Sequence, residues 1–298
     1  MCIRDRIKTS LKKVIIPVAG LGTRMLPVTK AIPKEMLPII NKPIIQFIVE
    51  EAAQAGFKEI IFVTHSSKYS IQNHFDKSFE LEATLEKRVR RSLLKEIRSI
   101  SNLNLTISTV RQHEAKGLGH AILCAKSIIG EEPFAVMLPD MIIDGSNKAN
   151  NLSMMKKSFQ ENAVSSILLG VAKKSEIRKY GIPKLKKIRD KNSYIIQKII
   201  EKPSLQNAPS NRFAVGRYVF ENKIFGYLAK TEPDKSGEIQ LTEAIDNFLK
   251  KGNQVFGFPL NGKVFDCGEK IGYLSANLEF AKKDPLLKRF LKSYMKNF

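Results

Sequence analysis

The sequence predicts a doubly wound α/β fold, and three observations lead to that prediction. Apolar runs of strand length, rich in β-branched residues, alternate with segments of helical periodicity along most of the chain. The first run, Lys13–Ala19, ends in a glycine turn, and a second run covers Glu59–Thr64. Between them a helix is expected over Pro43–Ala55, with proline in its first turn and Gly56 just after its end. A strand, a helix and a strand in that order imply two parallel strands joined by a right-handed crossover.

The same alternation continues toward the C-terminus, where we expect the mostly parallel sheet to become mixed. Further strands are expected over Leu105–Val110, Phe134–Leu138, Ser165–Val171, Ile195–Ile200, Phe213–Phe220 and Gln254–Pro259. Further helices are expected over Glu80–Ile100, Leu118–Ile128, Ala149–Glu161, Gln240–Lys250 and Lys270–Lys292. The helix over Glu80–Ile100 is too polar on all sides to lie in the core, so it is expected to be a solvated insertion.

The composition excludes several classes of protein. The chain of 298 residues has 50 Lys and Arg against 29 Asp and Glu, a formal net charge of +21. Such an excess can indicate nucleic-acid binding, but the basic residues are spread along the chain, which favours a solvated basic surface suited to small polyanionic substrates. No apolar run approaches the roughly 18 residues of a membrane span, so no membrane partner is expected. Cys2, Cys124 and Cys267 lack metal or redox spacing, and their odd number favours a reducing cytoplasm.

A phosphate-binding turn is the first candidate site. The segment Gly20-Leu21-Gly22-Thr23-Arg24 follows the first predicted strand directly. Two glycines let backbone N–H groups approach an anion closely, and the guanidinium of Arg24 can bind phosphate through two parallel hydrogen bonds. The dinucleotide-binding fingerprint is incomplete, because Met25 stands where its third glycine belongs. An ordinary turn after a strand is the alternative.

A lysine and two aspartates are the next candidates. Pro33 and Pro38 restrict the loop that carries Lys34, so this lysine can clamp a phosphate near the glycine turn. Asp140 follows the strand Phe134–Leu138 at the carboxyl edge, where open α/β sheets place ligands. Asp266, after the strand that ends at Pro259, offers a second carboxylate. Carboxylates beside phosphate-binding cations suggest Mg²⁺, although turn or capping duty is the alternative for either aspartate alone.

These motifs resemble, in order along the chain, those of the sugar-1-phosphate nucleotidylyltransferases. The matching segments run from about residue 12 to residue 279. They are GLGTRMLP (20–27), AIPKEMLP (31–38), THSSK (64–68), AKGLGHA (115–121), LPD (138–140), EKP (201–203), VGRY (215–218), GEIQLT (237–242) and DCG (266–268). An ordered series of this kind is far more specific than any one of its members.

The resemblance implies a domain organisation and a reaction. A single glycosyltransferase-A-like domain is expected over 12–298, with a Rossmann-like nucleotide-binding half at about 12–145, a sugar-phosphate-binding half at about 146–268 and a C-terminal helix over 269–298. Residues 1–11 match no element and are expected to be a disordered or adventitious leader. The implied enzyme uses Mg²⁺ to transfer UMP from UTP to α-D-glucose 1-phosphate, giving UDP-glucose and pyrophosphate. A homodimer or homotetramer is also implied.

The same resemblance assigns roles to individual residues. The expected catalytic residues are Arg24, Lys34, Asp140, Lys202 and Asp266, and the metal ligands among them are Asp140 and Asp266. The expected nucleotide-binding residues are Ala19, Gly20, Leu21, Gly22, Thr23, Glu35, Gln112 and Gly117. The expected sugar-phosphate-binding residues are Gly181, Glu201, Lys202, Val215 and Gly216.

Other functions stay open at this point. A thymidylyltransferase would keep the chemistry and change the nucleotide, although the KEML segment (34–37) and the charged insertion look like the uridylyl branch. A non-catalytic sugar-nucleotide sensor would be expected to have lost charged site residues, and all five are present. Nucleic-acid binding rests on net charge alone. The apolar stripe of the terminal helix can form a subunit interface or pack on its own sheet. It consists of Ile271, Leu274, Leu278 and Ala281.

Overall fold

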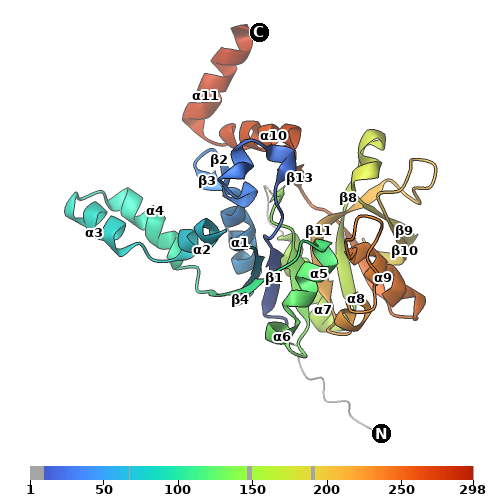
Figure 1. Cartoon of the computed structure of the whole chain (residues 1–298). Coiled ribbons are helices and arrows are strands. Elements are labelled where there is room, and N and C mark those ends of the chain that lie inside the picture. Colours follow the sequence, from blue (N-terminus) through green and yellow to red (C-terminus); the bar gives the residue numbers. More distant parts are fainter. Residues whose placement is uncertain (1–9, 67, 146–149, 189–191, 298) are drawn as a thin grey trace.

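The computed structural model describes residues 10–66, 68–145, 150–188 and 192–297, and it confirms the predicted α/β class (Figure 1). The strands are β1 (Lys13–Pro17), β2 (Pro38–Ile39), β3 (Lys42–Pro43), β4 (Glu59–Thr64), β5 (Thr106–Arg111), β6 (Phe134–Met137), β7 (Met141–Asp144), β8 (Ser165–Val171), β9 (Gly181–Lys187), β10 (Tyr194–Glu201), β11 (Arg212–Phe220), β12 (Val255–Pro259) and β13 (Lys263–Asp266). The helices are α1 (Ile44–Gln54), α2 (Tyr69–Phe75), α3 (Phe79–Lys87), α4 (Arg91–Ser101), α5 (Gly117–Cys124), α6 (Lys126–Ile129), α7 (Asn151–Asn162), α8 (Ile224–Leu228), α9 (Leu241–Lys250), α10 (Lys270–Ala281) and α11 (Pro285–Tyr294). No helix within these described ranges is long and apolar enough to cross a membrane.

One large sheet organises the molecule. In the described part of the chain its nine strands have the order β5-β4-β1-β6-β11-β8-β12-β10-β9. The first four are parallel, which confirms the parallel pairing predicted for the first two strands of the sequence. β11 runs antiparallel to both β6 and β8, and β9 and β10 form an antiparallel pair at the far edge. The sheet is therefore mixed toward the C-terminal part of the chain, as predicted.

Helices cover both faces of this sheet. Successive side chains of a strand point to opposite faces, so each buried strand contributes to two cores. In β1, Val14 and Ile16 pack in a core with α1, α2 and α7, whereas Ile15 packs in a second core with α5, α8 and α9. The loops at the carboxyl ends of β1, β4, β5 and β6 lie at one edge, between these two layers.

Three helices expected to be continuous are each divided. The segment expected as one helix over Glu80–Ile100 forms α3 and α4, because Val89 between them has a left-handed backbone (φ 55°). The terminal segment forms α10 and α11, because Asp284 caps a new helix that begins at Pro285, and proline cannot continue the preceding helix. The third helix is divided at Ala125 into α5 and α6. Figure 1 shows both the α3–α4 pair and α11 projecting from the body.

A small ladder that the sequence pattern does not predict brings two distant loops together. β7 and β13 have four residues each, too few for an apolar period to be recognised. They pair antiparallel, with Met141 opposite Asp266. The backbone N–H of Cys267 then donates to the carbonyl of Asp140 at 2.8 Å. Residues 140 and 266 are thus neighbours because of this pairing.

The start of the folded body differs slightly from the expectation. Residues 1–9, most of the expected leader, lie outside the described residues. Leu11 was expected in the leader, but it is 1% exposed and packs in the core with Val14 and Phe57. The folded body therefore includes Leu11.

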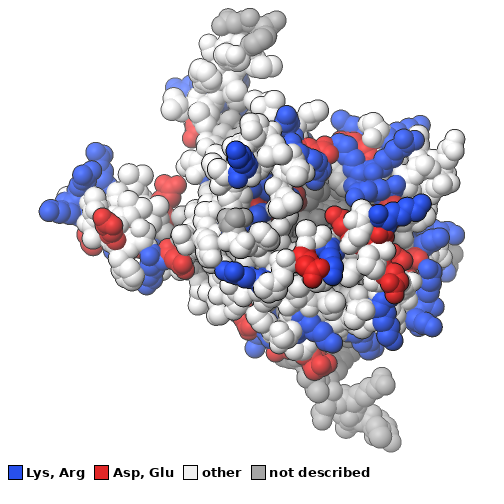
Figure 2. Space-filling view, in the orientation of Figure 1, with Lys and Arg blue, Asp and Glu red and all other residues white. Residues whose placement is uncertain are grey.

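The charge is dispersed over the surface. Figure 2 shows Lys and Arg over much of the visible face, with Asp and Glu among them. Many basic side chains also lie in ion pairs, such as Lys283 with Asp144 and Lys263 with Glu279. This distribution agrees with a solvated basic surface.

A buried arginine joins the middle of the sheet to the loop after β6. Arg217 of β11 is 0% exposed. Its guanidinium donates to both carboxylate oxygens of Glu51 on α1, with a shortest distance of 2.8 Å. It also donates to the carbonyls of Leu138 at 3.2 Å and Met141 at 2.7 Å. One side chain therefore fixes a helix, a strand and both flanks of Asp140.

Replacing this arginine tests the arrangement. We expect Arg217→Met to lower the free energy of unfolding by about 3–5 kcal/mol, because it leaves the Glu51 carboxylate and two carbonyls without their donor. Lys223→Met is the control. Lys223 is exposed in its ion pair with Glu221, so this substitution should lower the free energy of unfolding by less than about 1 kcal/mol. Urea denaturation measures both variants. Equal, small losses would show that Arg217 does not hold the fold together.

Candidate active site

A cavity of about 480 Å³ opens at the carboxyl ends of β1, β5 and β6. This is the edge at which open α/β sheets bind ligands. The start of α5 and one residue of the 237–242 segment complete its wall. Its lining residues are Pro17, Ala19, Gly20, Leu21, Gly22, Thr23, Arg24, Lys34, Gln112, Ala115, Gly117, Leu118, Ala121, Leu138, Pro139, Asp140 and Glu238.

The glycine turn presents free backbone donors to this cavity. Gly22 has a positive φ of 68°, and an added Cβ would lie 3.2 Å from a methyl carbon of Thr29. Thr29 in turn donates its hydroxyl to the Gly22 carbonyl at 2.8 Å. Within the described residues, the N–H groups of residues 20–23 have no acceptor. Successive free N–H groups in such a turn form a concave anion-binding site.

Lys34 and Asp140 form a short ion pair in the cavity. The Lys34 ammonium lies 2.6 Å from Oδ2 of Asp140, and both side chains are about 15% exposed. Burial opposes ionisation of Asp140, but the neighbouring ammonium outweighs it and holds the pKa of this carboxyl below its usual value. The same pairing outweighs burial at Lys34 and raises its pKa. Both groups are therefore charged at neutral pH.

Asp266 lies beside this pair. A Cβ added to Gly268 would meet Oδ2 of Asp140 at 2.8 Å, Oδ1 of Asp266 at 3.1 Å and Arg24 at 3.2 Å. The two carboxylates therefore face one small space that the missing side chain of Gly268 leaves open. Burial and the negative charge of Asp140 both raise the pKa of Asp266. Two carboxylates in this position favour a bound cation.

Arg24 is held at the rim of the cavity by an acidic residue. Its guanidinium donates to Glu269 at 3.1 Å, and Glu269 also accepts from Lys179 at 2.6 Å. The hydroxyl of Tyr180, next in the chain, donates to Asp266 at 3.2 Å. These contacts thus connect the glycine turn with the second half of the chain, through Arg24, Lys179, Tyr180 and Glu269.

The far end of the cavity holds an oriented amide. Gln112 is 5% exposed, and its Nε2 donates to the Gly117 carbonyl at 3.1 Å and lies 3.0 Å from Nδ1 of His120. Its Oε1 has no donor within the described residues. Gly117 has a φ of 80°, and an added Cβ would lie 2.8 Å from Cβ of Glu238. The amide oxygen is therefore the group left to bind a ligand.

The residues expected to bind the sugar phosphate form a separate group. Glu201 accepts from Thr242 at 3.0 Å, and burial raises the pKa of its carboxyl. Lys202 is more than half exposed, lies 3.6 Å from Glu201, and has a positive φ of 42°. Gly181 leaves room beside Glu201, since an added Cβ would lie 3.3 Å from its Oε2. Lys202 makes no ion pair with the Lys34–Asp140–Asp266 cluster in the part of the chain that the structure describes.

Val215 and Gly216, which were also expected to bind the sugar phosphate, are buried inside the protein. Val215 is 0% exposed, so its side chain belongs to the core. Gly216 has a φ of 85°, and its carbonyl accepts from the N–H of Leu138 at 2.8 Å. Both lie on β11 beside the loop that carries Asp140, and both residues are buried in this structure.

Glu35 was expected to bind nucleotide, but its side chain does not reach the cavity. It is 0% exposed and forms an ion pair of 2.8 Å with Lys68, which is itself buried. Burial raises the pKa of Glu35 and lowers that of Lys68, while their mutual attraction opposes both shifts. Successive side chains of the 3-10 turn at Lys34–Met36 leave it in different directions, and of these two residues Lys34 lines the cavity while Glu35 is buried.

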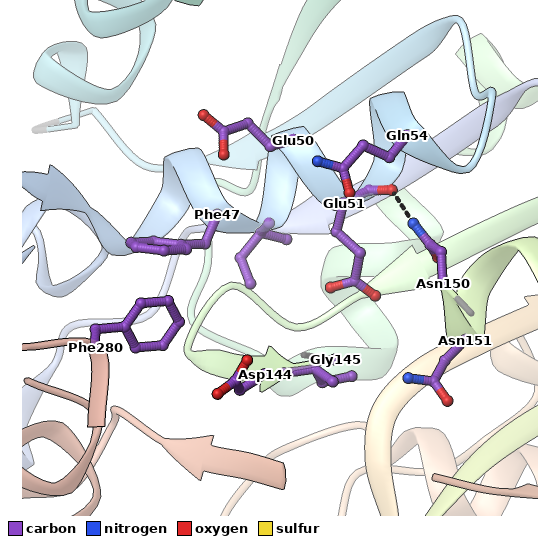
Figure 3. Close-up of a pocket in the computed structure, with 11 residues that line it drawn as sticks. Phe47, Glu50, Glu51, Gln54, Asp144, Gly145, Asn150, Asn151 and Phe280 are labelled. Carbon is purple, nitrogen blue, oxygen red and sulfur yellow. Dashed lines mark hydrogen bonds between the residues drawn. The ribbon is translucent and has the colours of Figure 1, made fainter. Parts of the chain in front are cut away.

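A second cavity of about 480 Å³ lies between α1, the end of β7 and the start of α7 (Figure 3). Glu51 and Asp144 face it, whereas the lining residue Glu50 points its carboxylate away, and each of the three has a basic partner at 2.5–2.8 Å. These pairs are Lys42–Glu50, Arg217–Glu51 and Lys283–Asp144. The side chain of Asn150 donates to the Glu51 carbonyl at 2.9 Å. Its acidic, internally bonded lining does not suit a polyanion, in contrast to the first cavity.

Several residues near the first cavity were not predicted to act there. Lys68 and Glu238 lie in segments that resemble the family, but neither has a type or spacing that indicates a role by itself. Tyr180 and Glu269 approach only through the β7–β13 pairing and the loop before β9. No local sequence signal could have found these two contacts.

Relatives of known name cover nearly the whole chain. A chain from Haemophilus ducreyi named UTP–glucose-1-phosphate uridylyltransferase is 53% identical over 274 residues, 90% of this chain and 92% of its own length. A protein of the same name from Escherichia coli K12 is 50% identical over 279 residues, 92% of this chain and 91% of its own length.

Solved structures agree with these relatives. A UTP-bound UGPase from Acinetobacter baumannii superposes with a TM-score of 0.87 at 41% identity, covering 96% of this chain and 99% of that one. A UDP-glucose pyrophosphorylase complexed with UDP-glucose gives a TM-score of 0.84 at 38% identity, covering 92% of this chain and all of the other. Residues 13–283 match the nucleotidyl transferase family. The chain belongs to the nucleotidyl transferase family.

Proposed function

We propose that this protein transfers UMP from UTP to α-D-glucose 1-phosphate, releasing UDP-glucose and pyrophosphate. The observation that carries the proposal is one cavity that combines the free N–H groups of residues 20–23, the ammonium of Lys34 and the carboxylate of Asp140. The names of the relatives, and the UTP and UDP-glucose in the titles of two similar structures, support the choice of substrates.

The triphosphate of UTP is assigned to the glycine turn. Its charge needs donors and cations, and the turn offers free N–H groups while Arg24 and Lys34 offer two cations within reach. Both cations now bind carboxylates, so phosphate oxygens would replace Glu269 and Asp140 as their partners. Gln112 is assigned to the uracil, because a free amide oxygen can accept the imide N–H of that base.

Asp140 and Asp266 fit a magnesium ion. The described residues hold no group of three or more His, Cys, Asp or Glu side chains that could bind a metal. Mg²⁺ does not require one, since it commonly binds one or two carboxylates and completes its shell with water and substrate phosphates. The space beside Gly268, faced by both carboxylates, suits such an ion. When bound, Mg²⁺ neutralises negative charge on the phosphate undergoing transfer.

The reaction then needs positioning more than proton transfer. An oxygen of the sugar phosphate attacks the α-phosphorus of UTP in line, forming one P–O bond while the bond to the leaving pyrophosphate breaks. A phosphate monoester has its second pKa at about 6, so the nucleophile is already ionised near neutral pH and no general base is required. Arg24 and Lys34 brace the triphosphate, and Lys202 orients the attacking phosphate.

The sugar is assigned to the second half of the site. Glu201 can accept hydrogen bonds from glucose hydroxyls, and Gly181 lies beside its carboxylate. Lys202 is exposed and bound only loosely to Glu201, so its ammonium can turn toward an incoming phosphate. We further propose a cytoplasmic location, since Cys124 and Cys267 are free thiols.

A product assay tests the function directly. Purified protein should release pyrophosphate from UTP and glucose 1-phosphate in the presence of Mg²⁺, and UDP-glucose should form in equal amount. Replacing UTP with TTP in this assay distinguishes a uridylyltransferase from a thymidylyltransferase. Absence of pyrophosphate with either nucleotide would refute a catalytic role and leave a sugar-nucleotide sensor as the better description.

Asp140→Asn tests the metal assignment. The substitution keeps the shape of the side chain but removes the charge, so turnover should fall by roughly 10²-fold or more, as when one electrostatic stabiliser is deleted. Asp144→Asn is a matched control, because that carboxylate faces the second cavity. Turnover is measured over a magnesium titration. Near-normal turnover of Asp140→Asn at limiting Mg²⁺ would make Asp140 a structural residue.

Lys202→Ala and Arg24→Ala test the separation of the two substrates. Lys202→Ala should weaken use of glucose 1-phosphate much more than binding of UTP, and turnover should fall because the attacking oxygen is misplaced. Arg24→Ala should harm the UTP side first. Steady-state kinetics with each substrate varied in turn, together with calorimetric UTP binding, separate these effects. Equal damage to both substrates in both variants would contradict the assignment.

We also propose that the protein forms a homodimer or homotetramer through its C-terminal helices. α11 buries none of its residues, and the large apolar side chains Ile271, Leu274, Leu286 and Phe290 of α10 and α11 are exposed. We expect Leu286→Ser with Phe290→Ser to reduce the mass measured by light scattering after gel filtration. Leu205→Ser, an exposed leucine elsewhere, should not. A monomeric wild-type protein would contradict the proposal.

A further inference from the structure

We propose that Lys68 is a positioning residue for the triphosphate site: by binding the carbonyl of Gly20 it directs the N–H of Leu21 into the cavity. The inference rests on the proposed function, because it assigns phosphate binding to that N–H. Lys68 itself is not among the residues that line the cavity. Its ammonium lies 2.6 Å from the Gly20 carbonyl oxygen and 2.8 Å from Oε2 of Glu35.

Lys68 and the cavity lie on opposite sides of the glycine turn. Lys68 directly precedes α2, whose buried residues Ile71 and Phe75 pack in the core beneath α1. The cavity is lined by Gly117, Leu118 and Ala121 of α5, which covers the other face of the sheet. The ammonium therefore reaches Gly20 from the α2 side of the turn, whereas the helical lining of the cavity comes from α5.

The geometry of one peptide unit links this contact to the ligand. In a trans peptide, the C=O of Gly20 and the N–H of Leu21 lie in one plane and point in opposite directions. Drawing the carbonyl toward Lys68 turns the N–H toward the cavity, where it has no acceptor within the described residues. It also keeps the carbonyl oxygen, which would repel phosphate, out of the anion site.

A buried carboxylate holds the lysine in place. Glu35 is fully buried, and its Oε1 has no hydrogen-bond partner within the described residues. Its negative charge is offset first by Lys68, which it contacts directly, and then by Lys34. Glu35 follows Lys34 in the chain, so the same ammonium connects the glycine turn to the loop that carries the phosphate clamp. The contact thereby fixes two phosphate-binding segments relative to each other.

A simpler role is that Lys68 only neutralises Glu35, and a pair of variants separates the two. In Lys68→Met the Gly20 carbonyl loses its donor and Glu35 is left buried and unpaired. Adding Glu35→Met removes that buried charge while the carbonyl still lacks its donor. If neutralisation were the whole role, the double variant would bind UTP as the wild type does.

The experiment measures inorganic tripolyphosphate binding by calorimetry and steady-state kinetics with UTP. We expect Lys68→Met to bind both tripolyphosphate and UTP roughly tenfold or more weakly than the wild type. The double variant should largely recover the wild-type thermal midpoint but should still bind both ligands roughly tenfold or more weakly. KM for UTP should rise more than KM for glucose 1-phosphate. Lys68→Arg, which keeps a charged donor, should restore part of the affinity. Lys156→Met is the control, because Lys156 likewise donates to a glycine carbonyl, that of Gly56 at 2.7 Å, away from the cavity.

Wild-type affinity for tripolyphosphate in the folded double variant would overturn the proposal, as would equal changes in the KM of both substrates. If Lys68→Met alone does not fold, the double variant and Lys68→Arg decide the matter. A wild-type protein that binds tripolyphosphate but does not convert UTP and glucose 1-phosphate would refute the proposed function instead. The calorimetric comparison still tests Lys68 in that case.

Discussion

The arrangement of the candidate active site depends on a charge buried in the middle of the sheet. Arg217 is surrounded by protein, and its guanidinium is satisfied by Glu51 and by carbonyls on either side of Asp140. An unpaired charge at this depth would be very costly, so the groups that satisfy it must keep their positions whenever the chain is folded. Asp140 therefore owes its position to β11 and α1, elements that carry no ligand-binding side chain of their own.

The site is electrostatically balanced before any substrate arrives. Lys34 is paired with Asp140, and Arg24 is paired with Glu269. Under the proposed function, a phosphate oxygen can replace the carboxylate partner of each cation, and the released Asp140 carboxylate can bind a metal ion. Binding would then exchange ionic partners without creating isolated charges. Burial and the negative charge of Asp140 raise the pKa of Asp266, and a cation between the two carboxylates would relieve their repulsion.

The sequence predicted the α/β class and the principal strands because long apolar runs report burial directly. The break before Pro285 carries a readable signal, Asp284 followed by proline, that the expectation of one terminal helix overlooked. The break at Val89 depends on a left-handed backbone that its residue type does not indicate. The meeting of residues 140 and 266 depends on two four-residue strands, which are too short to show a period. Glu35 was misjudged because adjacent residues of a tight turn point apart, so that Lys34 lines the cavity while its neighbour is buried.

The strand β9 lies at the edge of the large sheet, and its composition affects how the protein behaves at high concentration. An edge strand offers unpaired backbone groups to any other extended chain and can nucleate aggregation. β9 carries exposed Lys184, Lys186 and Lys187, and its Pro183 lacks an N–H, while the Pro183 carbonyl accepts from Ser210 at 2.7 Å. A second strand approaching this edge would meet three like-charged side chains and one place where no ladder bond can form. Part of the chain's large positive charge thus protects it against intermolecular β-sheet growth at high concentration.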